Sequence, residues 1–259
     1  TVASIKSFFE RHSENINNKI TLLDKIEKGI IKSLNSGTFK NITELISDSS
    51  VVKMQLFEDF VDFVAELTDS KEKQGSIGTG KGEVLLTMLC ANGYLPSSKG
   101  DVNLFGKNIE VKASNGIIAN WSQMKDIKET ENFFKENLSD DFTLSANNLE
   151  SLCKSLNSFQ DKKLVKKAFI KYFEQRAVEN FVKKEIKNIV KDLNFTTLDA
   201  KSIQTVFGKA ILSLYQESHG WDSILIFKES KNFLTTKICL ASSESDFNSL
   251  VNFTGLGMS

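Results

Sequence analysis

Residues 80–114 read GKGEVLLTMLCANGYLPSSKGDVNLFGKNIEVKAS, and this stretch decides the expected fold class. It predicts a helix that begins near Glu83, followed by two strands that are joined by the turn FGKN. The glycine in that turn favours a hairpin, which would bring Asp101 alongside Glu110. Because side chains alternate along a strand, Glu110 and Lys112 would point to the same side of the sheet.

The predicted neighbours Asp101 and Glu110 need a counter-charge. Two carboxylates about 4 Å apart repel each other by roughly 4 kcal/mol where the effective dielectric constant is about 20. Such a pair is stabilised by a cation or by a shared proton. Carboxylate oxygens with no His or Cys nearby favour Mg²⁺ or Mn²⁺ over zinc. Lys112 could hold a metal-activated water or neutralise charge that develops on a phosphate. These residue types point to a site that cuts phosphodiester bonds.

This order of residues resembles the PD-(D/E)XK nuclease superfamily, which includes restriction endonucleases, phage and repair exonucleases, and junction resolvases. The resemblance implies an α/β fold with a restriction-endonuclease-like core, in which helices flank a mixed β-sheet. It also implies hydrolysis of DNA with Mg²⁺ as the cofactor. The match covers about 35 residues directly and extends more weakly to the helix and strands near the C-terminal end.

The resemblance assigns roles to individual residues. Asp101 and Glu110 match the metal-binding acids, and the carbonyl of Val111 would be a further metal ligand. Lys112 matches the catalytic lysine, and Glu83 matches the helical acid that many members carry. One departure is that a glycine, instead of the family's proline, precedes Asp101.

Each part of this pattern also has a simpler interpretation. A Glu-x-Lys pair on a strand can be a solvated ion pair, and an Asp at a strand start can be a turn residue. A Glu in the first turn of a helix complements the helix dipole. All the parts together, in order, favour the nuclease. Two other classes stay open: a nuclease-fold DNA-binding or structural protein without turnover, and a mainly helical interaction protein with an accidental motif.

A second motif, GSIGTGK at residues 75–81, fits the start of a phosphate-binding P-loop but does not complete it. The next residue is Gly82, where a P-loop needs Ser or Thr to reach Mg²⁺. The segment also follows a helical pattern instead of a buried strand. We expect a flexible lead into the next helix, where Lys81 could hold a DNA phosphate, or a plain mobile loop. Lys99 is a second candidate of this kind. The helical pattern that precedes this motif, where a P-loop would have a buried strand, consists of Phe57, Phe60, Val61, Val64 and Leu67.

Composition limits the class of protein. The chain has 259 residues, 40% of them hydrophobic, and its twenty Phe predict a well-filled interior. A formal net charge of zero gives no global basic character, so any DNA-binding face must come from local clustering. Three Cys without metal-ligand spacing predict reduced core thiols. With these thiols, and with no secretory signal or membrane-spanning run in view, we expect a cytoplasmic protein without a membrane partner. Richness in Lys and Asn with a single Pro suggests an AT-rich genome, and hence a bacterial or phage-infected host cell.

The pattern along the chain predicts three parts. Residues 1–75 form a helical N-terminal region, residues 76–120 and 200–259 form the nuclease core, and residues 121–199 form a helical insertion. The N-terminal region carries an apolar stripe that we expect to pack against neighbouring helices, and it consists of Ile16, Ile20, Leu23, Ile26, Ile30 and Leu34.

The insertion supplies the local basic surplus. Residues 161–192 carry ten Lys or Arg against five acids, enough to follow a phosphate backbone. Lys163, Lys166 and Lys167 are the candidate DNA-binding residues, although a solvated helix face explains any single Lys more simply. The expected partner is DNA, and paired cuts in a duplex would favour a homodimer.

Overall fold

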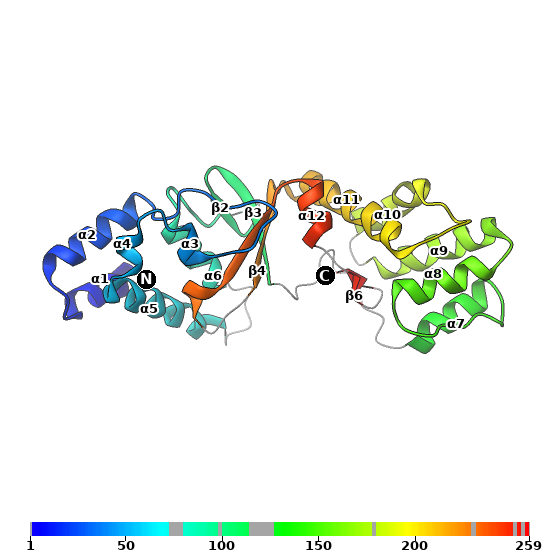
Figure 1. Ribbon diagram of the computed structural model, residues 1–259, viewed down its shortest axis with the longest axis horizontal. Coiled ribbons are helices and arrows are strands. Elements are labelled where there is room, and N and C mark those ends of the chain that lie inside the picture. Colours follow the sequence, from blue (N-terminus) through cyan, green and yellow to red (C-terminus); the bar gives the residue numbers. More distant parts are fainter. Residues whose placement is uncertain are drawn as a thin grey trace. The chain divides into compact units, whose positions relative to one another are not determined.

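The computed structural model divides the chain into two compact units. Unit 1 comprises Thr1–Ser114 and His219–Ser242, and unit 2 comprises Asn115–Ser218 and Ser243–Ser259. Figure 1 shows unit 1 mainly in blue, cyan and orange, with β2 and β3 in green, and the helices of unit 2 from green at α7 through yellow to red at α12. The structure describes residues 2–72, 80–97, 100–113, 127–177, 180–228, 232–250, 253–254 and 257–258.

Unit 1 contains a mixed five-stranded sheet in the order β1-β5-β4-β3-β2. Strands β3 and β4 are parallel, and the other neighbouring pairs are antiparallel. The expectation of an α/β protein with a mixed sheet flanked by helices is confirmed, while the finer restriction-endonuclease-like topology stays a prediction. The strands are β1 (Lys40–Asn41), β2 (Val102–Leu104), β3 (Lys107–Ala113), β4 (Ser223–Lys228) and β5 (Lys237–Ala241).

The predicted hairpin between β2 and β3 is present. Val102 pairs with Ile109 and Leu104 pairs with Lys107, which leaves a two-residue turn at Phe105 and Gly106. Both turn residues have positive φ angles, 55° and 75°. Such a turn matches the right-handed twist of the strands that it joins, and this fixes the register of the hairpin.

The core of unit 1 lies between its helices and one face of the sheet. The helices are α1 (Val2–Arg11), α2 (Ile16–Glu27), α3 (Ile42–Leu45), α4 (Ser49–Val52), α5 (Gln55–Glu72), α6 (Lys81–Leu89) and the short η2 (Phe233–Thr235). Helices α5 and α6 pack against each other, and α6 contacts β2. The pattern predicted for α5 is buried at its first four positions. The core joins Phe57, Phe60, Val61, Val64, Leu85 and Leu86 to Val102, Ile109, Leu225 and Leu240.

Two expectations for residues 1–75 need correction. The first half of the apolar stripe does not pack inside, because Ile16, Ile20 and Leu23 are 66%, 58% and 43% exposed. Periodicity predicts a helix face without telling whether another element covers it. The region is also not a separate helical part, since it contributes β1 to the sheet and its helices to the core of unit 1.

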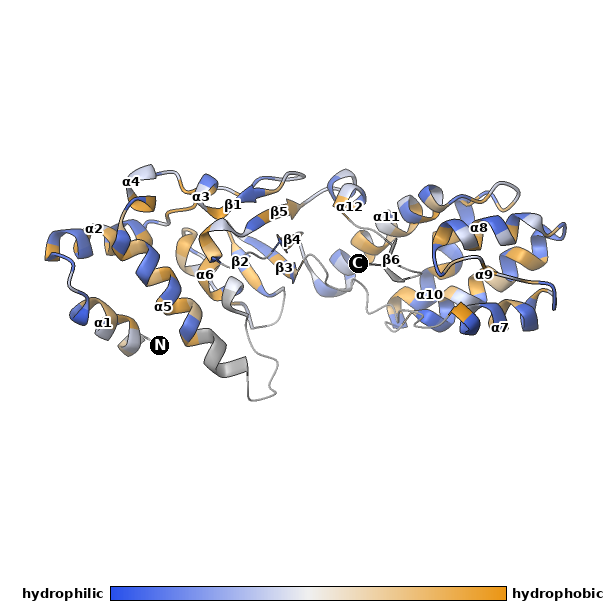
Figure 2. Cartoon of the chain, turned by 60° about the horizontal axis from the view of Figure 1, so that its bottom comes forward, coloured by the Kyte–Doolittle hydropathy of each residue, from blue (hydrophilic) through white to orange (hydrophobic). Residues whose placement is uncertain are grey.

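Unit 2 is mainly helical, as predicted for the insertion. Its elements are α7 (Ile127–Asn137), α8 (Leu149–Ser158), α9 (Lys162–Arg176), α10 (Asn180–Ile189), η1 (Val190–Asp192), α11 (Ala200–His219), α12 (Glu244–Leu250), β6 (Phe253–Thr254) and β7 (Gly257–Met258). Hydrophilic and hydrophobic residues alternate along these helices in Figure 2, as amphipathic helices require. Their buried faces form an aromatic core that includes Phe134, Phe142, Phe169, Tyr172 and Phe173.

The boundary of the predicted nuclease core also changes. We expected residues 200–259 to belong to the sheet-containing part, but only His219–Ser242 does. Helix α11 packs with the helices of unit 2 through residues such as Phe207, which lies 4.8 Å from Phe173 between ring centroids. Helix α12 is likewise part of unit 2. Sequence order alone could not show that α11 and α12 pack with the insertion.

The cysteines lie in the core, as the sequence predicts. Cys90, Cys153 and Cys239 are buried and form no disulfide within the described residues, and burial raises the pKa of the Cys90 and Cys153 thiols to about 12. Across the described parts of the chain, every helix is too short or too polar to cross a bilayer.

Candidate active site

Asp101 lies just before β2 and is tied to β3 at two points. Its backbone N–H donates to the carbonyl of Ile109 over 3.0 Å, and its Oδ2 accepts a hydrogen bond from the backbone N–H of Val111 over 2.8 Å. The residue before it, Gly100, has a φ of 70°, and a Cβ there would lie 2.9 Å from the Ile109 carbonyl oxygen. Proline fixes φ near about −65°, so this backbone could not hold the family's proline. The glycine is therefore a structural requirement at this position.

The carbonyl of Val111 faces the same neighbour. Within a β-strand, the N–H and C=O of one residue point to the same side and serve the same neighbouring strand. Since the N–H of Val111 meets Asp101, its carbonyl also points to the β2 side of β3. This arrangement places a backbone oxygen on the Asp101 side of the strand.

Glu110 and Lys112 point to the same side of β3, as predicted. Lys112 Nζ donates a hydrogen bond to Glu110 Oε1. Both residues pair with the parallel strand β4, Glu110 opposite Ile224 and Lys112 opposite Ile226. Their side chains are 12% and 31% exposed, so the pair is sheltered yet open to solvent at the lysine.

Glu83 lies in the first turn of α6, close enough to Asp101 and Glu110 for their charges to affect its pKa. Its Oε2 accepts a hydrogen bond from the backbone N–H of Gly80 over 3.1 Å. Burial and, to a smaller extent, the charges of Asp101 and Glu110 raise the pKa of Glu83 to about 7, while the Gly80 hydrogen bond and Lys112 act in the opposite direction. The carboxyl therefore changes its protonation near neutral pH.

The start of α6 is brought onto β4 by a close approach. A Cβ at Gly82 would lie 3.0 Å from the ring of Phe227, so this turn of the helix rests on that ring. A larger residue would push the helix start away from the sheet. Gly82, which breaks the P-loop motif, thus helps to hold Glu83 near the strands.

Glu110 also has a raised pKa, and its causes reveal a residue that the sequence did not suggest. Burial raises it most, the hydrogen bond and charge of Lys112 lower it, Asp101 raises it, and His219 lowers it. His219 ends α11 and precedes β4, the strand that pairs with β3. No local sequence signal marks His219, because its place near Glu110 depends on the pairing of β3 with β4. Its ring lies 5.4 Å from that of Trp221 between centroids.

The acids could hold a metal only with other ligands. Each carboxylate uses one oxygen in the contacts above, and Glu83 Oε1, Asp101 Oδ1 and Glu110 Oε2 accept no hydrogen bond from the described residues. Among those residues, no group of three His, Cys, Asp or Glu side chains is arranged to hold a metal. Mg²⁺ is commonly held by one or two carboxylates plus waters and substrate phosphates. The donor set fits such a water-rich site, with Asp101 and Glu110 as the side-chain ligands and the Val111 carbonyl beside them.

The predicted DNA-binding lysines fall in different places. Lys81 is the first residue of α6, where only its backbone is described, and Lys99 and residues 75–79 of the P-loop-like motif lie outside the described residues. Lys163 and Lys167 are exposed on α9 in unit 2. Lys166 is half-buried, with its Nζ 5.6 Å from the centroid of the Phe195 ring. The structure therefore groups these three lysines on one helix.

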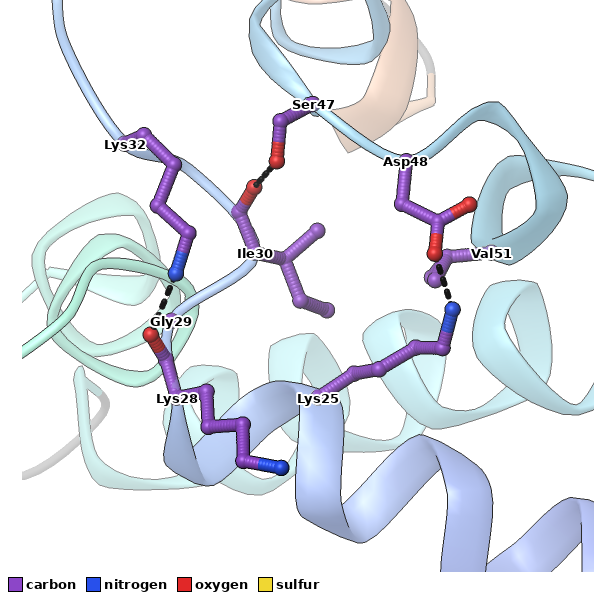
Figure 3. A pocket seen from close by; sticks show the side chains of 8 residues that line it. All are labelled: Lys25, Lys28, Gly29, Ile30, Lys32, Ser47, Asp48 and Val51. Atoms are coloured by element: carbon purple, nitrogen blue, oxygen red, sulfur yellow. Dashed lines mark hydrogen bonds and ion pairs between the residues drawn. The ribbon is translucent and has the colours of Figure 1, made fainter.

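A pocket of about 200 Å³ in unit 1 is built from other residues (Figure 3). Its floor includes Ile30, and lysines from α2 and the following loop surround it. Lys25 pairs with Asp48 and, by its hydrogen bond, lowers the pKa of that carboxyl to about 2. Lys32 Nζ donates to the carbonyl of Lys28 over 2.6 Å. None of the candidate catalytic residues lines this pocket.

Comparison with known proteins adds no assignment: no family model, no curated protein and no solved structure matches this chain. Membership of the nuclease superfamily therefore stays a prediction, supported by the residues and contacts described above.

Proposed function

We propose that this chain is a metal-dependent nuclease that hydrolyses DNA phosphodiester bonds with Mg²⁺ or Mn²⁺. The observation that carries the proposal is the hydrogen bond from Val111 N–H to Asp101, next to the Glu110–Lys112 pair on the same strand. This hydrogen bond holds Asp101 against the strand segment that carries Glu110 and Lys112, at the open end of the hairpin. The raised pKa of Glu83 supports the proposal: burial contributes most to the shift, and the charges of Asp101 and, more weakly, Glu110 add to it.

The residues would divide the work of hydrolysis. Asp101 and Glu110, with the Val111 carbonyl, would hold the metal, and Glu83 would hold it directly or through a water. The metal would supply Lewis-acid polarisation of the phosphate and a lower pKa for a bound water. Lys112 would orient or activate the attacking water, and its charge would stabilise the negative charge that develops on the phosphate. Glu110 would position the Lys112 ammonium through their hydrogen bond.

A second proposal concerns where DNA is held. Lys163, Lys167 and Lys171 lie four residues apart on α9 and are all exposed, so they form one basic row along the helix. Lys183 and Lys187 are exposed in the same way on α10, which packs against α9. Such a surface suits contacts with phosphates, which depend on charge and not on sequence.

The alternative function is a nuclease-fold DNA-binding or structural protein without turnover. It predicts the same basic surface but no bond cleavage. The presence of both acids and the lysine together favours turnover, because binding alone requires neither two half-buried acids, one in β3 and one just before β2, nor a lysine hydrogen-bonded to one of them.

Cleavage of labelled substrates tests the proposal. The full chain is incubated with single-stranded, duplex and branched DNA, and with RNA, in Mg²⁺, Mn²⁺, Ca²⁺ or EDTA. We expect at least one DNA form to be cut in Mg²⁺ or Mn²⁺ and none in EDTA. Binding of DNA without cleavage in any metal would support the alternative, and cleavage that persists in EDTA would contradict a metal-dependent site.

A further inference from the structure

Tyr94 is an aromatic residue whose exposure needs an explanation. Its side chain is 55% exposed, and among the described Phe, Tyr and Trp residues it is the only one of the exposed class. The remaining described Phe, Tyr and Trp side chains are buried or half-buried. Leu95, which follows it, is exposed as well, so the two residues present a small apolar surface to solvent.

The backbone holds Tyr94 in a fixed place at the edge of the sheet. Tyr94 N–H donates to the Asn103 carbonyl over 3.1 Å, and Asn103 N–H donates to the Tyr94 carbonyl over 2.8 Å. The preceding turn is tight, since a Cβ at Gly93 would lie 2.6 Å from the carbonyl oxygen of Thr87. A ring on such a support loses little freedom when it meets a ligand.

Tyr94 lies on the same face of the sheet as the candidate catalytic pair. Tyr94 is directly opposite Asn103, and Asn103 is directly opposite Asn108, whose Oδ1 accepts a hydrogen bond from Asn103 Nδ2 over 3.0 Å. Residues directly opposite each other share a face, and so do residues two apart on one strand. Asn108, Glu110 and Lys112 therefore share the face of Tyr94.

Strand geometry also gives the separation along the sheet. Asn103 follows Asp101 by two residues, and strands rise by about 3.4 Å per residue with about 5.5 Å between hydrogen-bonded partners. The Cα atoms of Tyr94 and Asp101 are thus roughly 9 Å apart. If a DNA strand binds with one phosphate at Asp101, a base next to that phosphate would lie within reach of the Tyr94 ring.

We propose that Tyr94 stacks an unpaired base next to the phosphodiester that is cut, so that the preferred substrate is single-stranded or frayed DNA. The inference rests on the proposed nuclease function. Bases in a duplex are stacked on each other, whereas an unpaired base exposes a face to an aromatic ring. A protein partner at Tyr94 and Leu95 would use the same surface without any preference between DNA forms.

Stacking is tested by fluorescence in Ca²⁺, which suppresses cutting. Single-stranded oligonucleotides carry one 2-aminopurine, moved along the strand, and are titrated with the parent, Tyr94→Ala and Tyr94→Phe. Ile20→Ala is the matched control, because Ile20 is a similarly exposed apolar residue on α2. We expect quenching at one or two positions with the parent, Tyr94→Phe and the control, and its loss with Tyr94→Ala.

Affinity supplies the second measure. Loss of one stacked base should weaken single-strand binding by between about 5-fold and about 150-fold in Tyr94→Ala, and leave blunt-duplex binding unchanged. Equal single-strand affinity and equal quenching for Tyr94→Ala and the parent would overturn the inference, as would an equal loss on both DNA forms. If the parent cuts DNA but Tyr94→Ala binds like it, the inference fails and the nuclease stands. If the parent shows Tyr94-dependent quenching but cuts nothing in any metal, the nuclease fails.

Discussion

The carboxylate of Asp101 accepts a hydrogen bond from the backbone N–H of Val111 over 2.8 Å. A side chain thus takes the place of a backbone partner at the end of the β2–β3 ladder. The same carboxylate would bind metal in the proposed mechanism, so its structural and chemical roles must be separated by choice of variant.

Asp101→Ala and Asp101→Asn should differ in stability. The Ala variant leaves the Val111 N–H without its partner and should lower the free energy of unfolding by about 1 to 2 kcal/mol. The Asn variant keeps an oxygen acceptor and should stay close to the parent. Urea unfolding measures both. Equal stability of the two variants would show that the hydrogen bond contributes nothing.

Lys112→Ala should bind metal and DNA but lose turnover. The lysine acts mainly on charge that develops in the transition state, so we expect a roughly 100-fold or larger fall in cleavage rate with little change in DNA affinity. DNA affinity is measured in Ca²⁺ and cleavage in Mg²⁺. Lys112→Arg serves as a control that keeps the charge and should fold as the parent does. Equal metal-dependent rates for the parent and Lys112→Ala would remove Lys112 from the mechanism.

Stability should fall as pH rises through the range in which Glu83 loses its proton. Its pKa is raised from 4.5 to about 7 in the folded chain, mainly by burial, so the folded state binds more protons than the unfolded state between these values. The contribution to stability is complete below pH 4.5 and lost as pH rises through about 7.

Glu83→Gln should remove this part of the pH dependence. The amide keeps an acceptor for the Gly80 N–H but does not titrate. After allowance for solvent screening, the difference between the two pH profiles should be on the order of 1 kcal/mol. Urea midpoints from pH 5 to pH 8 measure it. Parallel profiles for the parent and the variant would contradict the raised pKa.

The basic row on α9 should contribute to the salt dependence of DNA binding. Reversal of Lys163, Lys167 and Lys171 to Glu should reduce the slope of log affinity against log salt by about 0.9 for each lost duplex contact, or roughly 2.7 in total. A matched control reverses the exposed lysines Lys6, Lys32 and Lys53 of unit 1, which changes the net charge equally. The slopes are measured by titrating duplex DNA with the parent, the variant and the control across a salt series in Ca²⁺. An unchanged slope would mean a solvated face and would favour Lys81 and Lys99.

Local signals predicted the parts of the site that depend on neighbours in sequence. The period of two along residues 107–113 placed Glu110 and Lys112 on one side, and Gly106 in a short turn fixed the hairpin beside them. Both features depend on the backbone geometry of a few consecutive residues, which the local pattern of residue types specifies.

Features that depend on distant segments could not be predicted in this way. The charge of His219 affects the pKa of Glu110 only because β4 pairs with β3 after about 100 intervening residues. The exposure of Ile16 and Ile20 depends on which elements cover α2. The need for Gly100 depends on its approach to the Ile109 carbonyl across the hairpin, which only the structure shows.

Cleavage of DNA by Asp101→Asn and Glu110→Gln tests the central claim most directly. Both substitutions remove a metal-binding charge and keep the shape of the side chain, and circular dichroism checks that each variant is folded. The account predicts that the parent cuts DNA in Mg²⁺ and that each variant is slower by roughly 100-fold or more. If both folded variants cut DNA at the parental rate, these acids are not the catalytic site.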